Sequence, residues 1–191
     1  MAPDGLLRSV KCTPGVITTL AKKMNIRPLT AITDTEAFRE IRIESTKDAP
    51  ESFRATEQEM LARPIESFQR QLNVRDGDPV FIGAFEESSL IGVAALFFEE
   101  SQKLSHKATV GSVFVKPSSR RKGVGRALMA ELLVIAKKDK RLRQLNLTVN
   151  AANAPAVKLY ESLGFSIFGT EPNAAIVHGK GYDEHHMQCV L

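Results

Sequence analysis

A basic, glycine-containing stretch near the middle of the chain has the residue types of an anion-binding turn. It extends from Arg120 to Arg126 and reads RRKGVGR. An apolar run, Val113–Val115, precedes it and an amphipathic run from Ala127 follows it, so we expect a strand, a turn and a helix in that order. The first N–H groups of a helix have no partners within the helix and lie at the positive end of its dipole, so they bind anions. The two glycines would let the main chain approach such a ligand closely.

The spacing of these glycines excludes the common nucleotide-binding loops. A dinucleotide-binding fingerprint needs a third glycine three residues after Gly125, and Leu128 stands there. The chain also contains no G-x-x-x-x-G-K-[ST] string, which ATP- and GTP-binding loops require. From the residues alone, the stretch is therefore either a phosphate site of another kind or a plain turn between strand and helix.

A second segment pairs two polar side chains on one helical face. Asn153 precedes Ala154 and Pro155, an arrangement typical of a helix start, and Gly164 is a good helix terminator. Tyr160 follows Asn153 by seven residues, about two helical turns, so the two side chains share a face. Asn153 could act only as a helix cap and Tyr160 only as a core aromatic, and both alternatives stay open at this point.

The histidines and cysteines do not form a metal-binding pattern. His185 and His186 are adjacent in an extended segment, so their side chains point to opposite faces and cannot easily share one ion with Cys189. Cys12 and Cys189 match no disulfide framework. We therefore expect no metal cofactor, two reduced thiols and a cytoplasmic protein.

Composition narrows the class of protein further. The chain has 191 residues, a net charge of +4, two Tyr and no Trp. That length suits one domain with a substantial core. Nucleic-acid binding is disfavoured because aromatic residues do not accompany the basic clusters. No apolar run approaches the roughly 20 residues that span a bilayer, so we expect no membrane partner.

Residues 1–23 differ from the rest of the chain. They contain four basic residues against one acid and no continuous apolar segment, so they do not form a secretory signal. We expect an N-terminal extension that is disordered or packed on the surface, and one domain over residues 24–191, where a clean strand pattern begins near Met24.

Periodicity and turn residues predict a mixed α/β domain whose N-terminal half is mostly antiparallel. Capping-box spacings at Thr33 and Thr56 should start two helical regions, the second broken at Pro64. Gly111 is a candidate β-bulge. The expected strands are Asn25–Leu29, with Pro28 indicating a sheet edge, Pro79–Glu86, Leu90–Phe98, Lys107–Val115, Gln144–Val149, Phe165–Gly169 and Tyr182–Leu191. The later helices are expected at Gly123–Lys138 and Asn153–Leu163.

Taken together, the two segments resemble a known family. The string from Val113 through Pro117 to Leu128 resembles the acetyl-coenzyme A (acetyl-CoA) signature of the GNAT superfamily of N-acetyltransferases. The string from Asn153 to Phe165 is similar to that family's second motif. The resemblance covers roughly residues 24–191 and implies a central, mostly antiparallel sheet flanked by about four helices. It also implies an acyltransferase.

The resemblance assigns roles to individual positions. The loop amides from Arg121 to Arg126 would hold the pyrophosphate of the cofactor, and the backbone of the strand before it would pair with the pantetheine arm and face the thioester carbonyl. Asn153 would bind the cofactor arm, and Tyr160 would protonate the leaving thiolate. Arg120 would either solvate the loop or bind a ribose phosphate. The expected cofactor-binding residues are Val113, Phe114, Val115, Arg120, Arg121, Lys122, Gly123, Val124, Gly125, Arg126, Asn153 and Tyr160.

The expected reaction is direct attack of a neutral amine on the acetyl thioester in a ternary complex, which needs a proton acceptor. Many members of the family carry a glutamate where this chain has Thr148, and threonine is no base. The remaining candidates are Glu99, Glu100, His106 or water.

The acceptor should lie across the sheet from the cofactor, beside the helices of residues 34–72 and the last hairpin. The segment Ser45–Phe53 is similar to one found in members that acetylate small molecules, which favours a small primary amine. A protein or peptide N-terminal or lysine acetyltransferase and a non-catalytic acyl-CoA sensor are the alternatives. The sequence does not determine the oligomeric state, and a homodimer is the candidate assembly because dimers are the commonest closed form.

Overall fold

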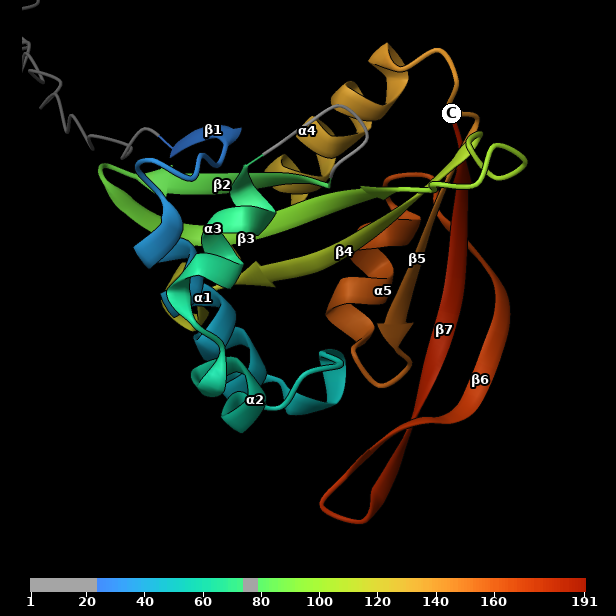
Figure 1. Ribbon diagram of the computed structural model, residues 1–191. Coiled ribbons are helices and arrows are strands. Elements are labelled where there is room, and N and C mark those ends of the chain that lie inside the picture. Colours follow the sequence, from blue (N-terminus) through green and yellow to red (C-terminus); the bar gives the residue numbers. More distant parts are fainter. Residues whose placement is uncertain (1–23, 74–78) are drawn as a thin grey trace, which may run out of the picture.

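Seven β-strands form one mixed sheet in the order β1-β2-β3-β4-β5-β7-β6 (Figure 1). The computed structural model describes residues 24–73 and 79–191. The strands are β1 (Met24–Pro28), β2 (Val80–Glu86), β3 (Ser89–Phe98), β4 (Lys107–Val115), β5 (Gln144–Asn150), β6 (Ser166–Val177) and β7 (Lys180–Val190). Every neighbouring pair is antiparallel except β4 and β5, which are parallel. This arrangement confirms the predicted mixed α/β fold.

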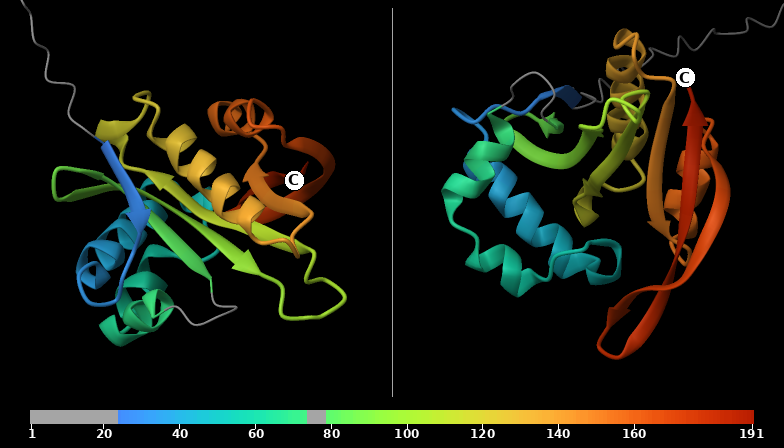
Figure 2. Two further views of the ribbon diagram at one scale, coloured as in Figure 1. Left: turned by 90° about the horizontal axis from the view of Figure 1, so that it is seen from above. Right: turned by 45° about the vertical axis from the view of Figure 1, so that its right-hand side comes forward.

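The helices of the described residues lie on both faces of this sheet (Figure 2). The helical elements are α1 (Thr35–Asp48), η1 (Pro50–Ser52), α2 (Glu57–Ala62), α3 (Ile65–Leu72), η2 (Pro117–Ser119), α4 (Val124–Lys138) and α5 (Ala154–Glu161). Side chains of α1, α2 and α3 pack in one apolar cluster with β2, β3 and β4, whereas α4 and α5 pack in another with β5 and β7. The sheet therefore separates two cores.

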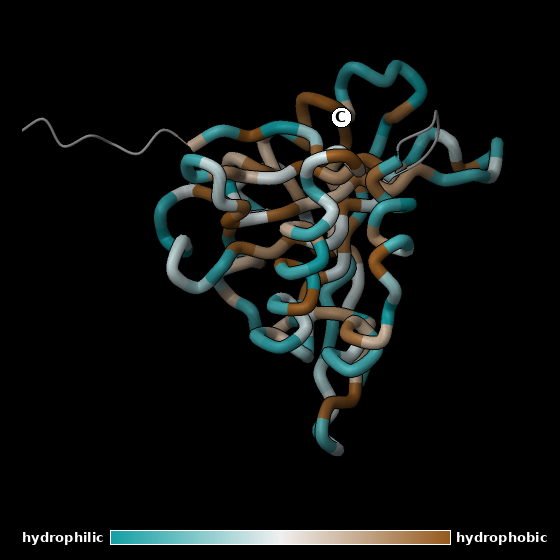
Figure 3. Tube along the Cα trace, turned by 60° about the vertical axis from the view of Figure 1, so that its left-hand side comes forward, coloured by the Kyte–Doolittle hydropathy of each residue, from teal (hydrophilic) through white to brown (hydrophobic). Residues whose placement is uncertain are grey.

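The distribution of hydropathy explains this layering. In Figure 3 the hydrophobic segments gather inside the molecule, while hydrophilic segments form the loops and the tip of the last hairpin. β3 is buried along most of its length because helices cover both of its faces. Along α1, Phe38 and Ile41 face the sheet and are fully buried. The helical region predicted after Thr33 is therefore present and packs these side chains against the sheet.

The connection from β1 to α1 differs from the predicted capping box at Thr33. The helix begins at Thr35 with Asp34 as its N-cap, and the side chain of Asp34 caps no helix N–H group. Both carboxylate oxygens of Asp34 instead accept hydrogen bonds from Arg27 of β1, at 2.7 and 2.8 Å. One of them also accepts a bond from the main chain of Thr30 at 2.8 Å. The tertiary ion pair has displaced the local cap.

Several other local signals are confirmed. Thr56 and Glu59 form a reciprocal capping box at the start of α2, and Pro64 separates α2 from α3. Pro28 lies on β1, which is an edge strand of the sheet. Gly164 follows α5 with a φ of +92°, the left-handed conformation expected of a helix terminator.

Two predictions about strands are corrected. β6 extends to Val177 and β7 begins at Lys180, so the last hairpin is much longer than the predicted Phe165–Gly169 and Tyr182–Leu191. Charged and amide residues within β6 hid this length, because most of its side chains are exposed and show no alternation. The irregularity in β4 involves Ser112, with a φ of +53°, rather than its neighbour Gly111.

The described residues include no helix long and apolar enough to cross a membrane. The predicted N-terminal extension, residues 1–23, lies outside the described residues.

Candidate active site

The parallel strands β4 and β5 are paired only where they begin. Their register joins Lys107, Ala108 and Thr109 to the start of β5, and no later residue of β4 pairs with β5. Figures 1 and 2 show the two strands leaving this common start and diverging toward their C-terminal ends. One edge of β4 around Val113–Val115 is therefore open to a ligand, while its other edge pairs with β3.

The turn between β4 and α4 presents free main-chain N–H groups. Ala127 donates to the carbonyl of Gly123 at 3.0 Å and is the first N–H that bonds within the helix. None of the described residues accepts a hydrogen bond from the main-chain N–H groups of residues 121–126. Arg121 and Gly123 have positive φ angles, of 61° and 80°, which turn this backbone sharply before the helix. The geometry is that of the anion cradle predicted from the sequence.

Glycine is favoured at the two positions of this turn for different physical reasons. Gly123 has a φ of +80°, and an added Cβ would meet nothing within 4 Å, so its conformation rather than lack of space favours glycine. At Gly125 an added Cβ would lie 3.3 Å from Leu159 and 3.8 Å from Val115. Gly125 therefore lets the start of α4 approach α5 and β4 closely.

The basic side chains of the turn separate into two groups. Arg120 forms an ion pair with Asp48 of α1, and its Nε donates to the carbonyl of Val115 at 3.0 Å. Arg126 donates to Ser162 after α5, at 2.9 Å. Arg121 and Lys122 are exposed. Arg120 and Arg126 thus hold the cradle to α1 and α5, whereas the side chains of the exposed pair are available to a phosphate.

Asn153 and Tyr160 lie on α5, as predicted. The side-chain oxygen of Asn153 accepts a hydrogen bond from the N–H of Ala156 at 3.2 Å, so this residue caps the helix. Its amide nitrogen bonds to no described residue. A single asparagine can serve both purposes, because the cap uses only the oxygen.

Tyr160 is almost completely buried, with 7% of its surface exposed. Its ring packs 6.1 Å from that of Phe165, and its hydroxyl has no hydrogen-bond partner among the described residues. Burial raises the pKa of Tyr160 to about 12, because the phenolate would be poorly solvated. The phenol therefore stays protonated at neutral pH and can donate to a neighbouring ligand atom.

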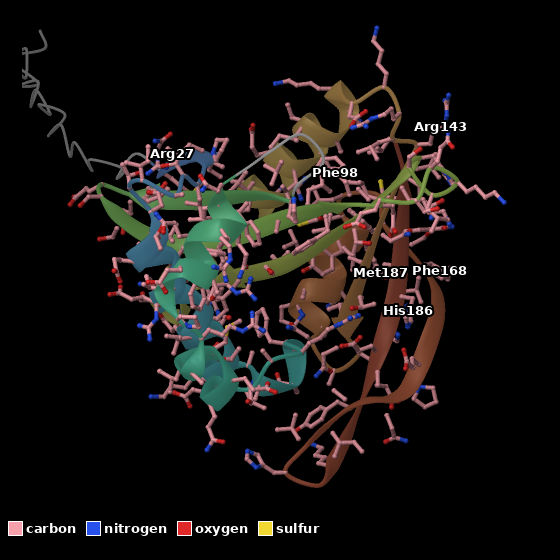
Figure 4. The ribbon with its side chains drawn as sticks, in the orientation of Figure 1. Arg27, Phe98, Arg143, Phe168, His186 and Met187 are labelled. Atoms are coloured by element: carbon pink, nitrogen blue, oxygen red, sulfur yellow. The ribbon has the colours of Figure 1, made fainter. Side chains whose placement is uncertain are left out.

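The base candidates named from the sequence lie at the other end of the sheet. Glu99 and Glu100 follow Phe98, which pairs with Ala108 near the beginning of β4. The carbonyl of His106 accepts a hydrogen bond from Arg143 at this same end, where Figure 4 places Phe98 and Arg143. Val113–Val115 lie roughly 20 Å from Ala108 along β4, because each strand residue advances about 3.3 Å.

Sequence reasoning missed a histidine at the open end of the site. His186 of β7 pairs in register with Thr148 of β5, so both side chains lie on the same face of the sheet. The neighbouring Met187 is buried in the core beside α4, so His186 faces the side of the sheet that carries α1 (Figure 4). Its Nε2 lies 3.1 Å from a carboxylate oxygen of Glu171 on β6. Only the strand register, which is a tertiary feature, reveals this proximity.

A pocket of about 390 Å³ lies near the C-terminal end of β5. Its lining residues come from η1, the β5–α5 connection, α5 and β7: Glu51, Asn150, Ala152, Asn153, Pro155 and Tyr182. Asn150 is buried and accepts a hydrogen bond from Ala152 at 2.8 Å, which fixes the bend after the strand. Residues from the η1 segment and the last hairpin, which the sequence associated with the acceptor, thus meet at one pocket.

The model of the Acetyltransferase (GNAT) family matches residues 36–165, which include the cradle, Asn153 and Tyr160. The chain belongs to the GNAT family. L-amino acid N-acetyltransferase AaaT of Escherichia coli K12 is 29% identical to it over 123 residues, which are 64% of this chain and 75% of that protein. Two further curated relatives are matched over 45% and 60% of their own length.

Solved structures of the GNAT fold agree with this assignment. Ribosomal-protein-alanine N-acetyltransferase from Brucella melitensis superposes with a TM-score of 0.74 at 27% identity, covering 87% of this chain and 99% of that one. The acetyltransferase yncA from Salmonella typhimurium, solved with its cofactor acetyl-CoA, gives a TM-score of 0.70 at 22% identity, covering 88% and 94%. This GNAT protein is an acetyltransferase that uses acetyl-CoA.

Proposed function

We propose that this GNAT protein transfers the acetyl group of acetyl-CoA to the primary amine of a small molecule by direct attack in a ternary complex. The observation that carries the proposal is the row of unpaired N–H groups from Arg121 to Arg126, placed beside the opening between β4 and β5. This arrangement suits a ligand with a negatively charged head and an extended arm, because the turn binds phosphate and the strand edge offers peptide-like pairing.

We assign separate roles in cofactor binding and in catalysis to the residues of the site. The cradle amides would bind the pyrophosphate, with each charge-assisted hydrogen bond contributing about 1.5–3 kcal/mol. The open edge of β4 at Val113–Val115 would pair with the pantetheine arm, and one N–H there would stabilise the oxyanion of the thioester. The free amide nitrogen of Asn153 would donate to the arm. Tyr160 would donate its proton to the thiolate as the C–S bond breaks.

We assign the acceptance of the amine proton to His186, directly or through a water molecule. It faces the acceptor side of the sheet beside Thr148, the position at which the resemblance to the family implies a glutamate in other members. Glu171 holds its Nε2, which leaves Nδ1 without a partner among the described residues and orients the ring. The nitrogen of the acceptor would form its bond to the acetyl carbon and lose one proton to this imidazole.

A small acceptor is favoured over a peptide by the enclosing elements. The η1 segment reaches across to β5 and β6, and it contributes Glu51 to the wall of the pocket described above. The name of the Escherichia coli relative, an L-amino acid N-acetyltransferase, agrees with a small acceptor. The Brucella structure, named for acetylation of a ribosomal protein, supports a peptide N-terminus as the second candidate.

Release of free thiol from acetyl-CoA tests the proposal. The full-length protein would be incubated with acetyl-CoA and, separately, with amino acids, polyamines, aminoglycosides and peptides that begin with alanine. We expect turnover with at least one class of small amine that exceeds turnover with every peptide. Fastest turnover with the peptides would support the second candidate instead. Acetyl-CoA binding without thiol release from any amine would show a non-catalytic sensor.

The cytoplasmic location and the homodimer stay predictions.

A further inference from the structure

The side chain of Arg42 on α1 is half-buried and has no carboxylate partner among the described residues. Its Nη1 donates to the hydroxyl of Ser112 on β4 at 2.7 Å, and its central carbon lies 5.8 Å from the ring centroid of Phe38. Its Nε is buried and has no hydrogen-bond partner. Burial and the nearby charge of Arg63 lower the pKa of Arg42 to about 10, and the group remains cationic at neutral pH.

Two other arginines near this helix have carboxylate partners, unlike Arg42. Arg27 pairs with Asp34, and Arg120 pairs with Asp48. None of the ion pairs among the described residues includes Arg42, whose only hydrogen-bonding partner there is a neutral hydroxyl. Withdrawing a cation from water without a counter-ion is costly, so an anion that arrives with a ligand would offset the cost at Arg42.

The position of Arg42 relates it to the reacting atoms. Its partner Ser112 is the residue of β4 with a φ of +53°, at the interruption of the β3–β4 register. Val113–Val115, to which we assign the thioester carbonyl, follow at once. α1 packs on the face of the sheet opposite α4, the same face toward which His186 points. Arg42 therefore lies on the acceptor side of the opening, next to the strand that would carry the acetyl group.

We propose that Arg42 binds a carboxylate of the acceptor, and that the acceptors of this enzyme are α-amino acids. This inference rests on the proposed function and specifies its substrate class. A guanidinium binds a carboxylate through two parallel N–H donors. In an α-amino acid the amine and the carboxylate share one carbon, so an anchored carboxylate leaves the amine close to the thioester. Polyamines and aminoglycosides would be repelled by Arg42 and Arg63, since like charges repel strongly where water is excluded.

Paired substrates that differ in the carboxylate test the inference, with each kcat/KM referred to the concentration of unprotonated amine, because a carboxamide lowers the pKa of the neighbouring amine. Each proteinogenic L-amino acid would be compared with its own carboxamide, which keeps the amine and the side chain but carries no carboxylate. We expect the free acid to have a kcat/KM roughly 10- to 100-fold above that of the amide, the range expected of charge-assisted hydrogen bonds. Arg42→Gln should bring this ratio close to that of two substrates without a charged anchor, because glutamine supplies no cation for the carboxylate. Because the ratio is taken within one preparation, a partly unfolded variant does not alter it.

Arg39→Gln provides the matched control, because Arg39 lies on the same helix, carries the same charge and makes no hydrogen bond or ion pair with Ser112. This variant should keep the preference of the wild type. Equal kcat/KM values for acid and amide in the wild type, or a preference that survives Arg42→Gln, would overturn the inference.

The same proteins distinguish this inference from the proposed function. Isothermal titration of the amino acids into the protein saturated with coenzyme A measures carboxylate binding without any chemistry. Binding that Arg42→Gln abolishes, in the absence of thiol release from any amine, would support the anchor and contradict the transferase. Turnover of neutral amines or polyamines but not of amino acids would support the transferase and contradict the anchor.

Discussion

The hydroxyl of Tyr160 lies in a largely apolar environment, which determines what it can do in the reaction. Burial raises its pKa to about 12, so it is protonated throughout the pH range in which an amine can attack. A phenol in this state is a hydrogen-bond donor to which a leaving thiolate can bind, and it lies two helical turns from Asn153, on the face that we propose for the cofactor arm.

Tyr160→Phe should therefore lower kcat by roughly 10²–10⁴, the usual contribution of a general acid, because the ring still fills its place while the proton is lost. Affinity for acetyl-CoA, measured by titration calorimetry, should change little. An unaltered kcat with the best acceptor would remove the acid role.

His186→Gln should lower kcat by roughly 10²-fold or more at neutral pH, since glutamine cannot accept the proton of the amine. His178→Gln is the matched control, because His178 is exposed in the turn of the last hairpin and forms no hydrogen bond with a described residue. Equal rates for the two variants would leave water as the proton acceptor.

At the scale of elements, α1 is held at both ends by ion pairs, one to β1 and one to the turn between β4 and α4. Arg27 of β1 binds Asp34 before the helix, and Asp48 at its last residue binds Arg120 of the cradle turn. The hydrogen bonds from Arg27 hold the pKa of Asp34 below its usual range. α1 thus connects an edge strand to the cofactor turn, and it places Arg42 between them.

Asp34→Asn should lower the free energy of unfolding by roughly 1–2 kcal/mol at pH 7, a value reduced for the partial exposure of Arg27. Because the folded pKa of Asp34 is depressed, its contribution is fully present above the unfolded value of about 4 and is lost as pH falls through the folded value. Urea unfolding of the two proteins should therefore converge once the pH lies below the depressed folded pKa of Asp34.

Asp139→Asn is the control for this comparison. Asp139 has a lowered pKa from Arg141, two residues away, but this exposed local pair joins no separate elements. We expect it to change stability by less than about 0.5 kcal/mol. An Asp34→Asn variant as stable as the wild type at pH 7 would show that the pair does not fix α1.

At the scale of the whole molecule, local signals predicted the elements and failed where distant residues compete. Thr56 caps its helix as predicted, yet Thr33 does not, because Arg27 engages Asp34 from another strand. Gly123 could be predicted because its positive φ is a local property of the turn, whereas the reason for Gly125 is its close approach to Leu159 and Val115. His186 beside Thr148 and Arg42 at Ser112 depend on register and on packing across the sheet, which no spacing in the sequence encodes.

Titration calorimetry of acetyl-CoA against two glycine variants tests the central claim most directly. Gly123 and Gly179 both have φ angles near +80°, and an added side chain would meet nothing at either position. The two substitutions thus impose the same backbone strain, one in the cradle and the other in the turn between β6 and β7. We predict that Gly123→Val weakens acetyl-CoA binding by about tenfold or more, from the cost of this conformation. Gly179→Val should bind like the wild type. Equal affinity of all three proteins would contradict the assignment of the β4–α4 turn to the cofactor.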